Sequence, residues 1–287
     1  MIKSMSVKEG ALSPMSYASL MVHVDVDAIL GARVGIAADL ARRFRAHLIG
    51  VAGCVPMSVS PPGQQPNDSV PSAPRLLDIK ALLDQKGQEF QVAVGKLDGY
   101  PEWRGQLEAP TELLAREARA ADLVIIGNKP DNSDPSRALD PGTVLLKAGR
   151  PVLVVPNNLR SLSLRHVAIA WKDVREARRA VLDALPLLQE AESVMIVEVV
   201  ESGHDQTLRG AKDVGAYLAR HGVKTIAERF RPTEVTASDS LLRFIEDENI
   251  GLIVSGAYGH SRLGEWAFGG VTRDLLAQSP ICCLFSH

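Results

Sequence analysis

The sequence repeats itself, and this repeat constrains the fold more than any other feature. Residues 122–127 of the 287-residue chain match residues 251–256, and the apolar run that begins at Pro151 matches the run that begins at Pro280. Both pairs lie 129 residues apart. A constant offset of this kind indicates that one structural unit occurs twice, and that each copy closes on a short apolar strand.

Each copy alternates strand-like and helix-like segments. Short apolar runs are separated by stretches with apolar residues at helical spacing. This order predicts an α/β fold with two tandem five-stranded parallel-sheet domains and helices on both faces. Pro186 lies inside the first helical stripe of the second copy and should kink that helix or end it early. The expected strands are 20–24, 48–54, 101–107, 123–127 and 152–155 in the first copy, and 167–171, 194–200, 223–230, 251–255 and 281–285 in the second.

The repeat also sets the expected domain boundaries. The first domain is expected at 20–156 and the second at 165–287, joined by a linker at 157–164, and residues 1–19 are expected to form a flexible tail. The two first strands lie 147 residues apart rather than 129, so the first domain holds about 18 extra residues. They fall in the segment 56–74, whose six prolines are typical of a surface insertion.

The composition excludes several classes of function. The 32 basic and 34 acidic residues give a net charge of −2, which argues against binding to nucleic acid or to an anionic membrane surface. No apolar run approaches the roughly 20 residues that a membrane helix needs. The first residues lack the apolar core of a secretory signal, and three cysteines cannot form a disulfide framework. We therefore expect a cytoplasmic protein.

The sequence shows no catalytic or metal-binding constellation. Its seven histidines include no close pair at ligand spacing, and no C-x-x-C motif occurs. Neither first strand is followed by a Rossmann G-x-G-x-x-G motif, and no G-x-x-x-x-G-K-[ST] motif is present. We expect no catalytic residue and no metal held by protein side chains.

The most informative motif follows the fourth strand of the second copy. That strand runs into Gly256, Gly259 follows three residues later, and Gly269 and Gly270 open a helix that contains Thr272. Glycine lets the backbone approach a ligand closely, and the free N–H groups at a helix N-terminus favour an anion. The pattern Gly-x2-Gly-x9-Gly at the end of a strand therefore predicts a phosphate cradle.

The repeat and the glycine pattern together resemble the universal stress protein family, over about residues 20–285. The resemblance implies a tandem of adenine-nucleotide alpha-hydrolase-like, Rossmann-like domains, with ATP, alone or with Mg²⁺, bound by the second. It also implies that the two fifth strands pair as an internal pseudo-dimer, and it leaves open a homodimer of tandems and an unidentified protein partner. Carried over residue by residue, the nucleotide-binding set is Ala170, Trp171, Lys172, Val199, Ser255, Gly256, Gly259, His260, Arg262, Gly269, Gly270, Val271 and Thr272.

Two positions in the second domain depart from the family pattern. Family members that bind ATP usually carry Asp where this domain has Lys172, and Ser or Thr where it has Gly270. An ammonium group only donates hydrogen bonds, so Lys172 cannot accept one from an adenine amino group, although it could reach a phosphate. Asp173 is a candidate replacement for the missing carboxylate, and Thr272 for the missing hydroxyl.

The first domain departs further. It keeps Asp25 at the end of its first strand, but Pro130 stands where the second glycine belongs, and Asp140 and Pro141 open the helix. Pro141 lacks an N–H donor, and Asp140 would repel a phosphate. We expect this domain to bind no nucleotide and to serve as a structural partner of the second.

The expected function is a non-enzymatic, adenine-nucleotide-responsive stress-regulatory or interaction module, with at most weak ATP hydrolysis. A different class of protein, a ligand-free interaction scaffold with both nucleotide loops vestigial, is the alternative. A true ATPase would need a positioned water and usually a metal-bound triphosphate.

Overall fold

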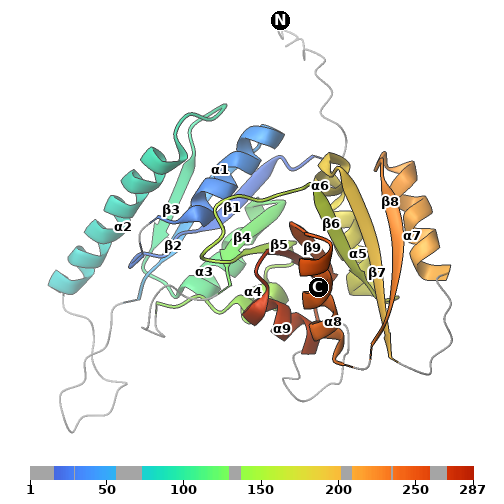
Figure 1. The fold of residues 1–287 in the computed structure, drawn as a ribbon. Helices are drawn as coiled ribbons and strands as arrows, with labels where there is room; N and C mark the ends of the chain where they lie inside the picture. Colours follow the sequence, from blue (N-terminus) through green and yellow to red (C-terminus); the bar gives the residue numbers. More distant parts are fainter. Residues whose placement is uncertain are drawn as a thin grey trace, which may run out of the picture.

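One continuous sheet holds all ten strands that the structure describes. The computed structural model describes residues 16–28, 30–55, 73–128, 137–201, 209–233, 235–258 and 270–287. The strand order is β3-β2-β1-β4-β5-β10-β9-β6-β7-β8 (Figure 1). Read inward from β3 and from β8, the two halves have the same order, third-second-first-fourth-fifth. The predicted α/β fold class is therefore confirmed.

The strands of the first half begin and end within one residue of their expected positions. Both α3 and α4 begin with a proline, which is favoured in the first helical turn because its missing N–H would have no helical partner there. Residues 56–72, most of the expected insertion, lie outside the described residues. The elements are β1 (Ser19–His23), α1 (Ala32–Phe44), β2 (His47–Gly53), α2 (Ala73–Val94), β3 (Glu102–Gln106), α3 (Pro110–Glu117), a 3₁₀ turn (Ala118–Ala120), β4 (Leu123–Gly127), α4 (Pro141–Lys147) and β5 (Val152–Val155).

The second half repeats this order with two local differences. Pro186 stands in the first turn of a separate short helix, which confirms that the preceding helix ends early. The expected strand 223–230 is wrong at both ends, since β8 begins at Ile226 and includes Pro232. The sheet tolerates this proline because β8 is an edge strand and pairs only with β7. The elements are β6 (His166–Trp171), α5 (Arg175–Asp183), α6 (Leu185–Glu190), β7 (Ser193–Glu201), α7 (Arg209–Arg220), β8 (Ile226–Thr233), α8 (Ala237–Asp247), β9 (Leu252–Gly256), α9 (Gly270–Gln278) and β10 (Cys282–Ser286).

The two halves join through their last strands. β5 and β10 run antiparallel, with Leu153 opposite Leu284 and Val152 opposite Phe285. The other strand pairings of the described sheet are parallel. The predicted pairing of the two fifth strands is therefore confirmed. Both strands are buried along their full length, because each covers the edge that the other would expose.

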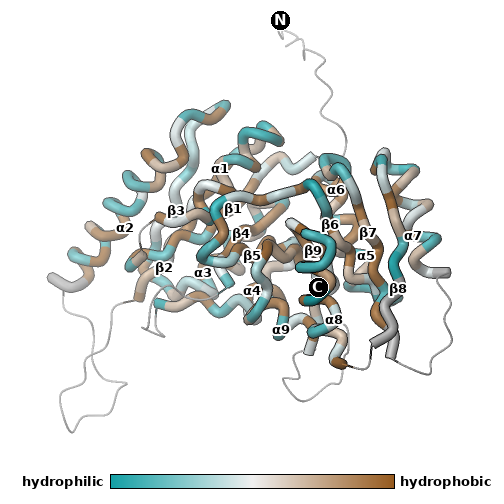
Figure 2. Tube along the Cα trace, in the orientation of Figure 1, coloured by the Kyte–Doolittle hydropathy of each residue, from teal (hydrophilic) through white to brown (hydrophobic). Residues whose placement is uncertain are grey.

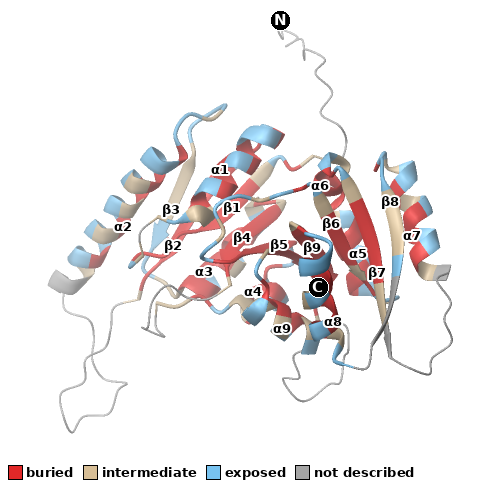
Figure 3. Ribbon diagram, in the orientation of Figure 1, coloured by how far each residue is buried: buried red, intermediate tan, exposed pale blue. Residues whose placement is uncertain are grey.

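Two layers of helices cover the sheet. One core cluster joins a face of the sheet to α1, α2, α5, α6 and α7, and a second joins the opposite face to α3, α4, α8 and α9. Successive strand residues alternate between the clusters, since Leu153 belongs to the first and Val154 to the second. The central strands are therefore apolar in Figure 2 and buried in Figure 3.

The segment before β1 is packed against both halves. Tyr17 is buried, and its ring meets the ring of Phe44 edge-on with 5.2 Å between centroids. Its hydroxyl donates a hydrogen bond of 2.7 Å to the carbonyl of Asp183 in the second half. The expectation of a flexible tail is therefore wrong for residues 16–19, because burial of one aromatic ring with a hydrogen-bonded hydroxyl fixes them. Residues 1–15 lie outside the described part.

The junction between the halves should contribute heavily to stability. Leu284→Ala removes a fully buried side chain from β10 and should lower the free energy of unfolding by about 2–5 kcal/mol. Leu182→Ala is the control, because Leu182 is 47% exposed on α5, and its loss should cost less than about 1 kcal/mol. Urea unfolding followed by circular dichroism measures both. Equal losses would show that the junction is not a critical part of the core.

Candidate functional site

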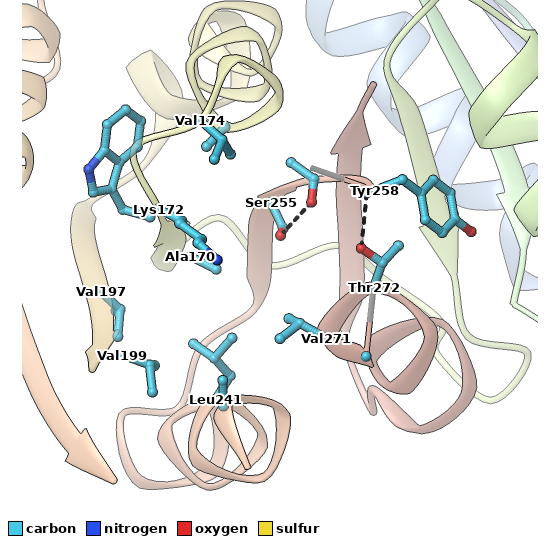
Figure 4. Close-up of a pocket in the computed structure, with 15 residues that line it drawn as sticks. Ala170, Lys172, Val174, Val197, Val199, Leu241, Ser255, Tyr258, Val271 and Thr272 are labelled. Carbon is cyan, nitrogen blue, oxygen red and sulfur yellow. Dashed lines mark hydrogen bonds between the residues drawn. The ribbon is translucent and has the colours of Figure 1, made fainter. Parts of the chain in front are cut away.

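A cavity of about 330 Å³ opens at the ends of β6 and β9 (Figure 4). These strands are neighbours, but the helices that follow them, α5 and α9, pack on opposite faces of the sheet. In open α/β sheets, ligands bind in the crevice outside the carboxyl ends of two such strands. The cavity therefore lies at the position where this topology provides a binding site.

Every predicted site residue that the structure describes lines this cavity. They come from β6, β7, β9 and α9, which are far apart in the sequence, and their role in binding stays a prediction. Gly259, His260, Arg262 and Gly269 lie outside the described residues. The residues that the cavity gathers are Ala170, Trp171, Lys172, Val199, Ser255, Gly256, Gly270, Val271 and Thr272.

Sequence reasoning missed six further lining residues. A period of two along β7 could have found Val197 from Val199, and the helical stripe of α5 begins with Val174 and Ala177. Nothing local in the sequence points to α8, which reaches the cavity only through tertiary packing. The missed residues are Val174, Ala177, Val197, Ala237, Leu241 and Tyr258.

The cavity has an apolar side and a polar side. Figure 4 shows Val197, Val199 and Leu241 grouped on one side, with Thr272 across the cavity from them. Thr272 stands in the first turn of α9, where backbone N–H groups have no partner within the helix and the helix dipole is positive. The arrangement suits a ligand with one flat apolar part and one anionic part.

The serine and threonine hydroxyl groups of the cavity make hydrogen bonds with the backbone. Ser255 donates to the carbonyl of Gly256 at 3.1 Å, and Thr272 accepts from the N–H of Tyr258 at 3.5 Å (Figure 4). Thr272 is also buried. Its hydroxyl proton is still available as a donor, because a hydroxyl both accepts and donates.

The two described glycines of the motif differ in what surrounds them. A Cβ on Gly256 would lie 2.6 Å from the backbone nitrogen of Ala177 and 2.7 Å from the carbonyl carbon of Glu176. Gly256 is therefore required for α5 to pack on the strand end, a reason that sequence reasoning missed. A Cβ on Gly270 would meet nothing within 4 Å among the described atoms, so this position is open on the cavity side.

Of the two charged residues that follow β6, only Lys172 lines the cavity. Lys172 is exposed and lines the cavity, and Figure 4 shows its side chain extending over the space between β6 and β9. Asp173 is exposed, forms an ion pair of 3.2 Å with Arg178, and is not among the lining residues. The structure therefore gives no support to the suggestion that Asp173 substitutes for the carboxylate, which stays a prediction.

Trp171 lines the cavity at the end of β6, but its ring packs into the core cluster of α5 and α7. Ala170 packs with the cluster of α8 and α9, so the next residue must face the cluster of α5 and α7. A Cβ on Gly210, at the start of α7, would lie 3.0 Å from the indole nitrogen of Trp171. The indole is therefore a core group rather than a stacking platform for a ligand.

The matching place in the first half is filled by the protein's own side chains. In the strand register His23 takes the place of Ala170. His23 is buried, and burial, together with the positive charge of Arg33, holds its pKa well below the usual value, so the imidazole is neutral. Arg33 lies so close to Gly127 that a Cβ there would collide with its guanidinium.

The helix N-terminus in the first half is capped from within. The carboxylate of Asp140 accepts from the N–H groups of Gly142 at 3.1 Å and Thr143 at 3.3 Å. Arg137, three residues before Asp140, forms an ion pair of 2.9 Å with Asp27, which follows β1. A carboxylate thus takes the N–H groups that a phosphate would need. This supports the expectation that the first half binds no nucleotide.

The described residues contain neither a metal-binding cluster nor a membrane-spanning helix. No group of three or more His, Cys, Asp or Glu side chains in this part of the chain could hold a metal ion. No helix there is long and apolar enough to cross a membrane.

Comparison with known proteins rests on structure. No protein-family model and no curated protein matches the sequence. A universal stress protein from Archaeoglobus fulgidus superposes with a TM-score of 0.62 at 14% identity, over 94% of this chain and 96% of that chain. A Pseudomonas aeruginosa protein provisionally identified as a universal stress protein superposes with a TM-score of 0.58 at 15% identity, over 95% of this chain and 94% of that chain. A functionally unknown protein from the same organism superposes with a TM-score of 0.56 at 14% identity, over 95% of this chain and 93% of that chain. At these identities the likeness shows a shared fold.

The two glycines should respond differently to the same substitution. Gly256→Ala forces a methyl group against the backbone of α5 and should lower the free energy of unfolding by about 1–3 kcal/mol. Gly270→Ala has open space and should leave that free energy unchanged or raise it by about 0.4–1 kcal/mol, because alanine restricts the unfolded chain. Urea denaturation of both variants checks this. A tolerated Gly256→Ala would contradict the packing role of Gly256.

Proposed function

We propose that this chain, which has the universal stress protein fold, is a non-catalytic, adenine-nucleotide-responsive stress-regulatory module of the cytoplasm that binds ATP in its second half. The observation that carries the proposal is the cavity at the ends of β6 and β9, with an apolar side and a helix N-terminus opposite. The base and ribose would contact the apolar side chains, and the phosphates would face the first turn of α9.

The size of the cavity supports a single nucleotide. Small-molecule sites commonly measure roughly 300–1,000 Å³, and about 330 Å³ lies at the lower end of that range. A base with its ribose fits this volume better than a dinucleotide does. The phosphates would extend past Gly270, where the described atoms leave open space.

The lining supports binding rather than turnover. The titratable side chains among the described lining residues are Lys172 and Tyr258, and neither is a carboxylate that could orient an attacking water. Mg²⁺, where it accompanies ATP, would be held by phosphate oxygens and water, as this ion usually is.

The second half would bind the ligand, and the first half would serve as its structural partner. The Asp140 cap and the His23 side chain fill the equivalent place in the first half. A homodimer of this chain would have to use a surface other than the fifth strands, because β5 and β10 already cover each other. A protein partner would bind preferentially to the ligand-bound state of the second half.

The first test is whether the purified protein retains nucleotide. Ultraviolet absorbance and mass spectrometry of the supernatant after denaturation should reveal an adenine nucleotide, and calorimetric titration with ATP should give saturable binding. No retained nucleotide together with no calorimetric binding would favour the ligand-free interaction scaffold.

A carboxylate placed at the start of α9 should abolish phosphate binding without unfolding the protein. Gly270→Asp puts a negative charge where the phosphates would lie, and should weaken ATP binding at least about tenfold. Stability should hold, because an acidic residue is favourable in the first helical turn. Pro141→Asp, the same change at the equivalent position of the first half, is the control and should leave ATP affinity unchanged. Equal effects would place the ligand elsewhere.

Lys172 should determine how well the site accepts an adenine. Lys172→Asp supplies an acceptor for the adenine amino group and should tighten the binding of adenosine, which has no phosphate, about tenfold. Calorimetry with adenosine and ATP at two salt concentrations measures this. If ATP binding weakens, adenosine binding stays unchanged and the wild type shows the stronger salt dependence, then Lys172 contacts the phosphates instead.

A further inference from the structure

Tyr258 has an unusual backbone conformation at the phosphate end of the cavity. It follows β9 by two residues, lines the cavity, and has a φ of 58°, a region that residues other than glycine seldom adopt. Its N–H donates to the hydroxyl of Thr272, which ties the end of β9 to the first turn of α9. A conformation of this kind persists only where the surroundings fix it.

The side chain of Tyr258 is fixed by the first half of the chain. Figure 4 shows its ring turned away from the cavity, toward the ribbon of the first half. The ring packs against the core cluster on that face of the sheet, to which Val144 and Leu145 of α4 belong together with residues of α8 and α9. Burial, and then the negative charge of Asp140, raise the pKa of Tyr258 to about 12, so the phenol stays protonated close to the capped end of α4.

The end of the chain holds the ring from another direction. The ring of His287 meets the ring of Tyr258 edge-on, with 6.2 Å between centroids. A ring nitrogen of His287 lies 3.1 Å from the carbonyl oxygen of Ala257, and its own backbone carbonyl accepts from Arg179 at 2.9 Å. Ala257, the residue before Tyr258, is therefore held in place as well.

These contacts form one connected path between the halves. Asp140 caps the start of α4, α4 and the ring of Tyr258 belong to the same core cluster, and the backbone N–H of Tyr258 donates to the hydroxyl of Thr272. We propose that the first half sets the geometry of the anion-binding end of the second, with Tyr258 as the positioning residue that connects them. This inference rests on the proposed function for its ligand. According to this inference, the first half positions residues of the binding site without itself contacting the ligand.

The test compares phosphate-bearing and phosphate-free ligands on the full-length chain. Tyr258→Gly keeps the φ accessible but removes the ring, and should lower ATP affinity about tenfold while adenosine affinity stays unchanged. Asp140→Ala removes the α4 cap and should also lower ATP affinity, by about two- to tenfold. The double variant should lose less than the product of the two, because both act on one path. Tyr258→Phe, which keeps the ring, should lose less than Tyr258→Gly.

Asp122→Ala is the matched control for Asp140→Ala. Asp122 also accepts hydrogen bonds from two backbone N–H groups in the first half, those of Ala18 at 2.7 Å and Ser19 at 3.0 Å, but it lies at the amino ends of the strands. The Asp122→Ala substitution should destabilise the first half without changing the ratio of ATP affinity to adenosine affinity. Equal changes in that ratio for Asp122→Ala and Asp140→Ala would overturn the proposal. So would wild-type ATP affinity in a folded Tyr258→Gly variant.

Hydrogen exchange separates failure of this inference from failure of the proposed function. In the ligand-free protein, amides of residues 272–276 should exchange about two- to tenfold faster in Tyr258→Gly and Asp140→Ala, and at the wild-type rate in Asp122→Ala. If the wild type binds no ATP, the proposed function fails, and faster exchange in these two variants still supports the path. Unchanged exchange in α9 overturns it.

Discussion

The antiparallel pairing of β5 with β10 is the contact on which the rest of the molecule depends. Each copy of the repeat ends on an apolar strand that would be an unpaired edge by itself, and unpaired apolar edges invite aggregation. Pairing the two edges buries both strands and makes one ten-stranded sheet. It also brings α4 and α9 near each other, since each helix directly precedes one of the paired strands (Figure 1).

This arrangement lets two copies of one unit diverge in function. The start of α4 is capped by Asp140, whereas the equivalent start of α9 carries Gly270 with open space beside it. A capped helix is stable without a ligand, because a side chain of the protein satisfies its first N–H groups. The first copy therefore has a fixed support at the place where the second has the cavity. The proposed role of Tyr258 is a consequence of the same pairing, because its ring reaches the support through the junction.

Sequence reasoning found most of the site and missed its supports. Glycine spacing and strand ends located Ser255, Gly256 and Thr272, because these signals are local in the chain. The same reasoning gave Gly256 a ligand-facing role and missed that α5 also packs against it. It also offered Asp173 as a substitute carboxylate, but Asp173 does not line the cavity and pairs with Arg178. Both omissions have one cause: the local sequence does not determine the direction of a side chain or the approach of a neighbouring helix.

The sequence by itself determined the class of fold and the duplication, while the pairing of the fifth strands was expected from the resemblance to a family and from the two apolar strand edges. Periodicity and a constant offset carry that information, because each strand and helix must present an apolar side to one core. Only the tertiary structure decided that Tyr17 is buried between the halves, that Leu241 closes the cavity, and that Tyr258 turns its ring toward the first half. Each of these contacts joins residues far apart in the chain or sets the direction of a side chain. Such contacts depend on the packing of whole elements, and packing is settled only when the complete sheet and both helical layers have formed.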